Sequence, residues 1–324
     1  MSGPTSRPWL RLIDCAPLAL FAVVLCVFGL KSDRFLTADN LTQILVQSSS
    51  TAVVATGMTF VLLTAGVDLS VGAIMFIGAG IAGKMALAGQ PLPLCLLAMV
   101  GVGVLGGAVN ALLVTRLKLV PFIATLATLY IGRGVGRWLT QTRAMNLPDS
   151  FLALGSAKWL GIPLPLWITG AVLLVAQSVL SNTPFGRQLY ALGNNAEAAR
   201  KSGLHTTRLL ASVYVLAGLC AGIGGILALS QLGSVSPKFG EFYEFDAITA
   251  AVLGGTSLFG GRGKVFPGTF LGAVLLKSIF NGLVIVQADP YLYPLGTSAI
   301  IFAALLVDSL RCRFLGQLER RKVF

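Results

Sequence analysis

The strongest constraint on this chain is a succession of long apolar runs that fills nearly its whole length. A helix needs about 20 apolar residues to cross the hydrocarbon core of a bilayer. We therefore expect about ten membrane-spanning helices, at 15–31, 42–64, 69–88, 93–115, 119–140, 164–181, 208–230, 244–259, 265–286 and 292–310. The eighth run is short, and the sequence leaves open whether it crosses fully.

Composition excludes a soluble fold. Of the 324 residues, 55% are hydrophobic and only 11% are charged, too few to cover a soluble surface. Glycine pairs four residues apart, such as Gly103 with Gly107 and Gly218 with Gly222, predict closely packed helices. The predicted fold class is an all-α integral membrane protein with one transmembrane domain over 1–324.

The basic residues are spread unevenly between the two sides of the predicted bundle. With the N-terminus inside, most of the 24 basic residues fall in cytoplasmic segments, namely 1–14, 116–118, 187–208, 262–264 and 311–324. The positive-inside rule then predicts a cytoplasmic N-terminal segment 1–14 and a basic cytoplasmic tail 311–324. The same rule accounts for the net charge of +12, so we expect no nucleic-acid partner.

Groups for catalysis or metal binding are scarce. The only histidine is His205, and no histidine, cysteine or acidic cluster has metal-ligand spacing. The stretch Gly260–Val265 resembles a phosphate-binding loop, but Val265 stands where a serine or threonine is required. We therefore expect a chain that is not an enzyme and that holds no metal, cofactor or ATP of its own.

The cytoplasmic loop 182–207 contains the signals of a short helix. Asn195 is a good N-cap, Glu197 suits the first turn, the basic pair at 200–201 suits the last turn, and Gly203 is a good stop. A helix of about seven residues is unstable alone in water. It needs a surface to dock on, which is either its own chain or a partner.

Four stretches carry a family pattern in a fixed order: Gly57–Gly72, Pro121–Gly134, Gly186–Gly203 and Tyr243–Ser257. Together they resemble the permease subunits of ribose-type and other simple-sugar ATP-binding-cassette (ABC) importers, over residues 35 to 310. The loop also contains Glu197, Ala198 and Ala199 followed by Gly203, which is similar to the EAA motif of other ABC permeases. The Ile-x-Leu-Pro that should follow is missing, which favours the ribose-type architecture over the maltose-type one.

The resemblance implies a type II-like importer permease with two related halves in a bacterial inner membrane. Two permease chains would form the pathway, a periplasmic binding protein would deliver the sugar, and ATP with magnesium would bind to separate ATPase subunits. The resemblance makes 182–207 the coupling loop to the ATPase, with these residues: Gly186, Arg187, Gly193, Asn195, Glu197, Ala198, Ala199, Ser202 and Gly203.

Two Gly-rich breaks hint at the related halves. Thr64–Gly72 and Leu253–Gly261 each interrupt one apolar run and lead into another. Paired breaks in the two halves of a transporter often mark the transport site. The match is short, and chance similarity is the alternative.

Polar residues inside the predicted spans are candidates for the translocation pathway: Asp68, Ser70, Asn110, Thr125 and Thr256. A buried charge at Asp68 is costly and often functional, but Asp68 could also cap a helix that opens at Leu69. Asn110 and Thr125 could instead make hydrogen bonds between helices. Arg133 and Arg137 lie near the outer end of the fifth predicted span and could extend toward the interface.

Three acids near the outer face, Glu241, Glu244 and Asp246, are candidates for contact with the binding protein; a solvated rim is the alternative. Three other classes of protein stay open. A self-sufficient secondary transporter or channel would need ionisable groups deep in its spans, and Lys277 is the main one expected here. A membrane enzyme would need paired acids or histidines. A branched-chain amino-acid or nucleoside permease would belong to the same superfamily.

Overall fold

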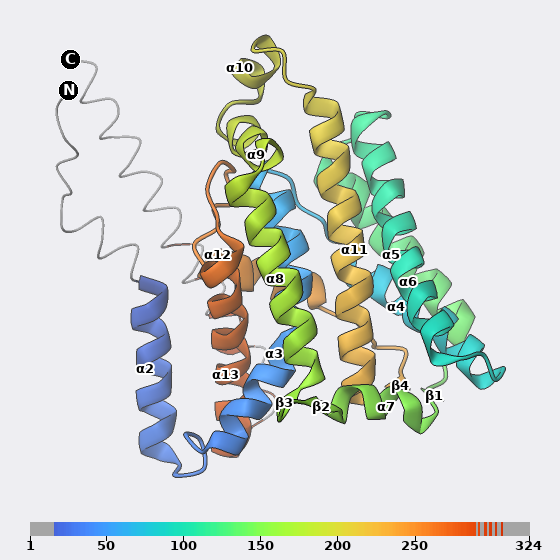
Figure 1. The fold of residues 1–324 in the computed structure, drawn as a ribbon, viewed down its shortest axis with the longest axis vertical. Coiled ribbons are helices and arrows are strands. Elements are labelled where there is room, and N and C mark those ends of the chain that lie inside the picture. The colour runs from blue at the N-terminus through green and yellow to red at the C-terminus, as the bar shows by residue number, and fades with distance from the viewer. Residues whose placement is uncertain are drawn as a thin grey trace.

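The computed structural model describes residues 16–289, together with 291, 295, 296, 298, 299, 302 and 306. In this part of the chain the fold is almost entirely helical, and the long helices run side by side in one bundle (Figure 1). The predicted N-terminal segment 1–14, the basic tail 311–324 and most of the tenth span 292–310 lie outside the described residues.

The long helices are α2 (Ala16–Lys31), α3 (Ala38–Leu63), α4 (Val71–Leu87), α5 (Leu92–Thr115), α6 (Pro121–Thr140), α8 (Leu164–Asn182), α11 (Thr206–Leu232) and α13 (Phe270–Ile285). Shorter helices are α7 (Asp149–Ser156), α9 (Pro184–Asn194), α10 (Ala196–Lys201) and α12 (Tyr243–Leu253), and a π-helical turn η1 (Val265–Thr269) leads into α13. Strand β1 (Met145–Asn146) pairs antiparallel with β4 (Ser234–Val235), and β2 (Lys158–Trp159) with β3 (Ile162–Pro163).

Each of the first nine predicted spans contains one of these helices. Within the described residues, five helical stretches are long and apolar enough to cross a membrane, at Ala38–Leu63, Leu92–Thr115, Leu164–Asn182, Thr206–Leu232 and Val265–Ile285. The eighth predicted span differs most from expectation, because α12 has only 11 residues. At about 1.5 Å per residue it covers roughly half of a bilayer core that is about 30 Å thick.

Glycine contacts bring α5 and α11 together in the middle of the bundle. A methyl group on Gly103 or Gly107 would overlap the backbone of α11, and one on Gly218 would overlap the backbone of α5. Small residues permit this close approach in lipid, where packing between helices replaces the hydrophobic effect. The packing role predicted from the glycine spacing is confirmed for these two helices.

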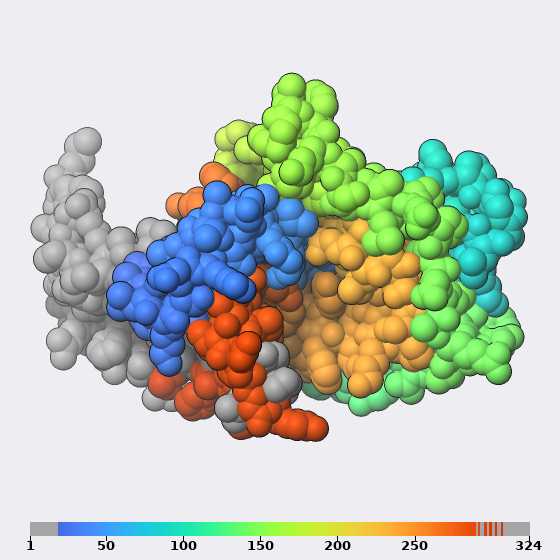
Figure 2. Space-filling view, turned by 90° about the horizontal axis from the view of Figure 1, so that it is seen from below, coloured from blue at the N-terminus to red at the C-terminus, as the bar shows by residue number. Residues whose placement is uncertain are grey.

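The bundle has two different ends. Helices α9 and α10 lie at one end, and α7 with the strands lies at the other (Figure 1). Figure 2 shows the molecule from the strand end. Helices α2, α3 and α13 lie on the left, α11 lies beside them, and the connection between α6 and α8 lies on the opposite side of α11. The end with α9 and α10 is called the coupling end below.

The two Gly-rich breaks that the sequence pairs have different backbones. Residues 64–70 pass from a turn into a buried stretch that leads into α4, whereas residues 254–261 form successive turns after α12. The two breaks do meet, since the amide of Gly261 donates to the Leu63 carbonyl at 2.9 Å. Similar composition therefore does not give similar local structure at these two breaks, and the related halves stay a prediction.

Candidate transport site and coupling segment

The break between α3 and α4 is held by a carboxylate. Asp68 is fully buried and accepts hydrogen bonds from the Ser70 amide at 2.9 Å and the Ser70 hydroxyl at 2.7 Å. Helix α4 begins at Val71 with Ser70 at its N-cap position. The predicted helix start at Leu69 with an Asp68 cap is therefore wrong, because Asp68 satisfies the backbone of the break and not that of the helix.

A side chain from α5 ties this break to two helices. The Asn110 amide nitrogen donates to the Ser70 hydroxyl at 2.7 Å and lies 3.3 and 3.4 Å from the two Asp68 carboxylate oxygens. The Asn110 oxygen accepts from the Thr128 hydroxyl of α6 at 2.8 Å. In lipid, a nonhelical backbone is tolerated only where such partners satisfy its polar groups.

Thr125 extends the network along α6. Its hydroxyl donates to the Pro121 carbonyl at 2.9 Å and reaches the Val67 carbonyl of the break at 3.4 Å. The structure thus brings together four of the five predicted pathway residues, and all four are fully buried: Asp68, Ser70, Asn110 and Thr125. In this conformation they form a closed internal contact and do not line an open passage.

Thr256 lies in the loop that follows α12 and makes no side-chain hydrogen bond to this network. Its hydroxyl is buried and has no hydrogen-bond partner among the described residues. Tyr214 of α11, which the sequence did not single out, lies against the break at Gly66. A methyl group on Gly66 would contact the Tyr214 hydroxyl, which is also buried and lacks a described partner.

The first turns of α4 and α12 meet inside the bundle. A methyl group on Gly72 would overlap the Gly240 carbonyl and the Glu244 carboxylate, and a methyl group on Gly240 would overlap Gly72. Arg133 of α6 locks this contact by donating to the Phe239 carbonyl at 2.6 Å and to the Gly240 carbonyl. The Arg133 guanidinium is thus held by two backbone carbonyls just before α12, and its extension toward the outer interface stays a prediction.

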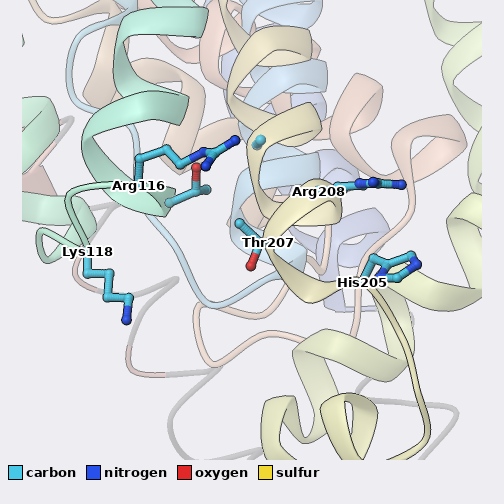
Figure 3. A pocket seen from close by; sticks show the side chains of 7 residues that line it. Arg116, Lys118, His205, Thr207 and Arg208 are labelled. Atoms are coloured by element: carbon cyan, nitrogen blue, oxygen red, sulfur yellow. The ribbon is translucent and has the colours of Figure 1, made fainter.

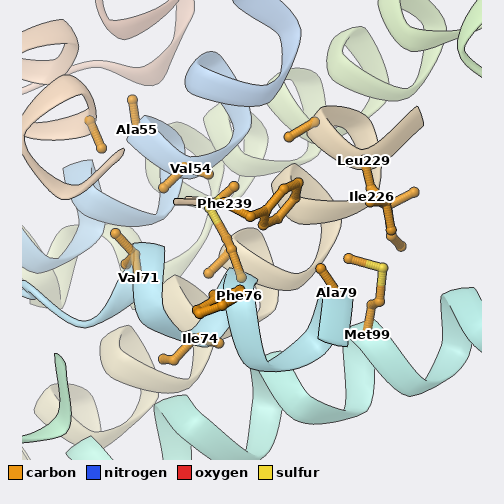
Figure 4. Packing of buried hydrophobic residues seen from close by; sticks show 14 of the residues in the cluster. Val54, Ala55, Val71, Ile74, Phe76, Ala79, Met99, Ile226, Leu229 and Phe239 are labelled. Carbon is orange, nitrogen blue, oxygen red and sulfur yellow. The ribbon is translucent and has the colours of Figure 1, made fainter. Parts of the chain in front are cut away.

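An apolar cluster surrounds this junction. Phe239 lies among buried residues of α3, α4 and α11, which include Val54, Phe76 and Leu229 (Figure 4). The Arg133 guanidinium lies 5.7 Å from the centre of the Phe76 ring. The junction is thus a partly buried polar contact at the edge of a packed apolar cluster.

The structure separates the three acids that the sequence grouped as contacts for a binding protein. Glu241 is exposed, Glu244 is only 4% exposed, and Asp246 pairs with Lys277 of α13 at 2.8 Å. Both side chains of that ion pair are 17% exposed. In this conformation only Glu241 is free to meet a partner, and Glu244 with Asp246 belongs to the interior.

The coupling loop folds as two consecutive helices. The Thr183 hydroxyl caps α9 by accepting from the Gly186 amide at 3.3 Å, and the Asn195 side chain caps α10 by accepting from the Ala198 amide at 2.9 Å. Gly203 follows α10 with a φ of 82°, a conformation suited to glycine. The short helix predicted from its caps is confirmed, whereas α9 was not predicted.

Helix α10 projects from the coupling end with little cover. It lies beyond the tips of its neighbours in Figure 1, and Ala199 is its only buried residue. Glu197 and Lys201 form an exposed ion pair at 2.9 Å, and the Ser202 hydroxyl donates to the Ala198 carbonyl at 2.9 Å. A helix this short and this exposed makes few contacts with its own chain.

Helix α9 connects this exposed tip to the interior. A methyl group on Gly193 would overlap the carbonyl of Leu63, the last residue of α3. The Tyr190 hydroxyl donates to the Gly263 carbonyl at 2.8 Å. Gly186 packs equally closely on the Leu180 carbonyl of α8, and Arg187 faces outward. The coupling segment therefore contacts both the break after α3 and the loop after α12.

Comparison with known proteins identifies the family. Residues 40–310 match the family described as branched-chain amino acid transport system / permease component. The chain belongs to this permease family. It is 35% identical to the ribose import permease protein RbsC of Haemophilus influenzae, over 92% of this chain and 94% of the relative.

Other relatives have similar coverage. The chain is 36% identical to RbsC of Escherichia coli K12, over 94% of this chain and 95% of the relative. It is also 36% identical to the D-allose transport system permease protein AlsC of the same strain, over 90% of each. No solved structure matches. These relatives are transport permeases, and among the described residues of this chain no group of three or more histidine, cysteine or acidic side chains could hold a metal ion.

Proposed function

We propose that this chain is the transmembrane permease subunit of an ABC importer that moves a monosaccharide from the periplasm to the cytoplasm. The relatives named for ribose and allose import support a sugar, because each aligns over nine-tenths of this chain or more. The family description names branched-chain amino acids, but it covers a broad superfamily, and the long matches are to sugar permeases.

The exposed helix α10 carries the proposal. It is too short to be stable without a docking surface, and its own chain buries only Ala199. We assign the missing surface to an ABC ATPase on a separate chain, which would hold the ATP and magnesium, so the permease needs no cofactor of its own. The coupling end then faces the cytoplasm, with both termini on that side of a bacterial inner membrane.

The remaining assembly follows from the same proposal. A second permease chain would complete the pathway, and a periplasmic binding protein would deliver the sugar near the exposed Glu241. The type II-like fold, with about ten spans and two related halves, is consistent with α4 and α12. Both are helices that start inside the bundle after an irregular stretch, and Gly72 in the first turn of α4 contacts Gly240, just before α12, and Glu244 in its first turn.

The contacts suggest how ATP could move the pathway. ATPase closure would displace α10, and α9 would pass the displacement through Gly193 to the end of α3 and through Tyr190 to the loop after α12. Those two places adjoin the break that contains Asp68 and the helix that contains Glu244. A rigid connection of this kind can switch two elements together, because packed backbones have few alternative arrangements.

A self-sufficient secondary transporter is the second candidate. Buried ionisable residues favour it, and the structure has more of them than the sequence suggested: Asp68, Glu244 and the Asp246–Lys277 pair. Such residues often carry coupling ions. The same residues have structural partners here, however, since Asp68 satisfies a break and Asp246 is paired.

Uptake by cells of the source organism separates the two candidates. The chain would be deleted and restored, and uptake of labelled ribose, allose, fructose and leucine would be measured. The importer proposal expects loss of one or more monosaccharides with leucine unaffected, and expects restored uptake to stop when ATP is depleted by arsenate but to survive a protonophore. Uptake that survives ATP depletion and stops with the protonophore would instead establish the secondary transporter.

A further inference from the structure

A basic pocket opens at the coupling end, between the C-terminal end of α5 and the N-terminal end of α11 (Figure 3). Its volume is about 580 Å³. The polar residues that line it are Thr115, Arg116, Lys118, His205, Thr207 and Arg208. The proposed transport function uses none of these side chains.

The pocket carries uncompensated positive charge. Arg116, Lys118 and Arg208 are exposed, no acidic residue lines the pocket, and none of the three makes an ion pair with a described residue. The first turn of α11 adds the positive end of a 27-residue helix, and no side chain caps it. The Thr207 hydroxyl can donate a further hydrogen bond, whereas the Thr115 hydroxyl already donates to the Ala111 carbonyl at 2.6 Å. This combination suits a phosphate group.

An exposed apolar stripe leads directly to this charge. Leu105, Val109 and Leu112 of α5 are 67%, 50% and 53% exposed, and their spacing places them on one helix face that continues to Arg116. A ligand that fits both features has a phosphate at one end and hydrocarbon below it. A free phosphate or a sugar phosphate would use the pocket alone, and the experiment below separates these ligands from a lipid.

We infer that this pocket binds the headgroup phosphate of an anionic phospholipid, with the acyl chains lying along the Leu105–Leu112 face of α5. Basic residues at the end of a membrane helix are a known way to hold such headgroups. The inference goes beyond the proposed function, because it depends on neither the solute nor the ATPase.

Lipid retention by the full-length protein tests the inference. The chain would be purified in mild detergent, and bound phosphatidylglycerol and phosphatidylethanolamine would be measured by native mass spectrometry during lipid titration. The test variant is Arg116→Gln with Arg208→Gln. The matched control is Arg262→Gln with Lys264→Gln, which removes two exposed charges from the same end outside the pocket. A third variant, Arg116→Lys with Arg208→Lys, keeps the charge.

We expect the test variant to bind phosphatidylglycerol roughly 30-fold more weakly, because each surface cation contributes on the order of a fivefold gain in affinity for anionic lipid. The control and the lysine variant should stay close to wild type, and phosphatidylethanolamine binding should change little. Equal losses in test and control variants would mean attraction by net charge alone and would overturn the site. Displacement of the lipid by millimolar inorganic phosphate would overturn the lipid as ligand and assign a free phosphate.

Co-purification of an ABC ATPase with the same variants gives a further outcome. If the test variant binds lipid normally but no longer co-purifies with an ABC ATPase, the pocket is a protein contact and the lipid assignment is wrong. All variants should elute as one sharp peak in size exclusion, because the substituted side chains are exposed. That elution check separates lost lipid binding from lost folding.

Discussion

The buried amide of Asn110 should be one of the most costly side chains to remove. It bridges the break at Ser70 and the helix at Thr128 through hydrogen bonds of 2.7 and 2.8 Å, and it lies within 3.4 Å of both Asp68 carboxylate oxygens. The change Asn110→Ala removes all of these partners at once. It leaves the Asp68 carboxylate buried with only the amide and hydroxyl of Ser70 as donors.

The size of the effect follows from these contacts. Hydrogen bonds between membrane helices contribute on average about 0.6 kcal/mol each, and up to about 1.7 kcal/mol, so the two short bonds account for roughly 1–3 kcal/mol. Leaving a buried group short of a partner costs about 1–3 kcal/mol more. We therefore expect Asn110→Ala to lower the free energy of unfolding by about 2–4 kcal/mol, allowing for partial relaxation.

Reversible unfolding in mixed detergent micelles, followed by circular dichroism, measures this change. The matched control is Asn182→Ala, at the exposed last position of α8, which should change the stability by less than about 0.5 kcal/mol. A double-mutant cycle with Ser70→Ala should show coupling between the two positions. If Asn110→Ala were no more destabilising than Asn182→Ala, the network would not hold the break, and the reasoning would be refuted.

Two further substitutions test other contacts. Gly193→Ala forces a methyl group against the Leu63 carbonyl; it should destabilise by about 1–3 kcal/mol and abolish most ATP-driven uptake while ATPase binding survives, whereas Gly170→Ala, with no atom within 4 Å, should leave both unchanged. Lys277→Met leaves the Asp246 carboxylate buried and unpaired; it should cost about 3–5 kcal/mol in thermal or detergent unfolding, and adding Asp246→Val should restore most of the loss. Failure of that rescue would mean that the ion pair is not what Lys277 contributes.

Local signals were sufficient for the helices. Apolar runs of about 20 residues placed a helix in each of the first nine predicted spans, and the cap residues Asn195 and Gly203 located α10 to within a residue or two. Both signals depend only on neighbours in the sequence. The glycine spacing of α5 and α11 also predicted close packing, because small residues on one face have few other uses in lipid.

Contacts between segments that are distant in the sequence could not be predicted from such local signals. Nothing in the sequence identifies the partners of Arg133, which are carbonyls at 239 and 240, more than 100 residues away. The sequence treated Glu244 as an outer acid, although that residue enters the core at the first turn of α12. A charge in an apolar run signals that a partner exists, and only the fold shows which one.

The candidate site was predictable in part. Asp68, Ser70, Asn110 and Thr125 were selected because polar groups in lipid need partners. The first three prove to be partners of one another, and Thr125 reaches the same break through the Val67 carbonyl. Tyr214 was missed because a tyrosine inside an apolar run has no distinguishing sequence signal. Thr256 was chosen by the same argument as the other four, but its hydroxyl has no hydrogen-bond partner among the described residues. The polarity of these residues therefore identified the cluster but did not show which of them hydrogen bond within it.

The central claim is that α10 docks on an ABC ATPase, and co-purification from the native membrane tests it most directly. Tagged wild type would be compared with Glu197→Ala plus Gly203→Pro, which alters the exposed helix and its stop, and with Gly170→Ala as a control. We predict that an ABC ATPase is recovered with wild type and with the control but not with the α10 variant, at equal membrane insertion. Recovery of no ATPase with wild type in several mild detergents, or equal recovery with all three proteins, would contradict the account.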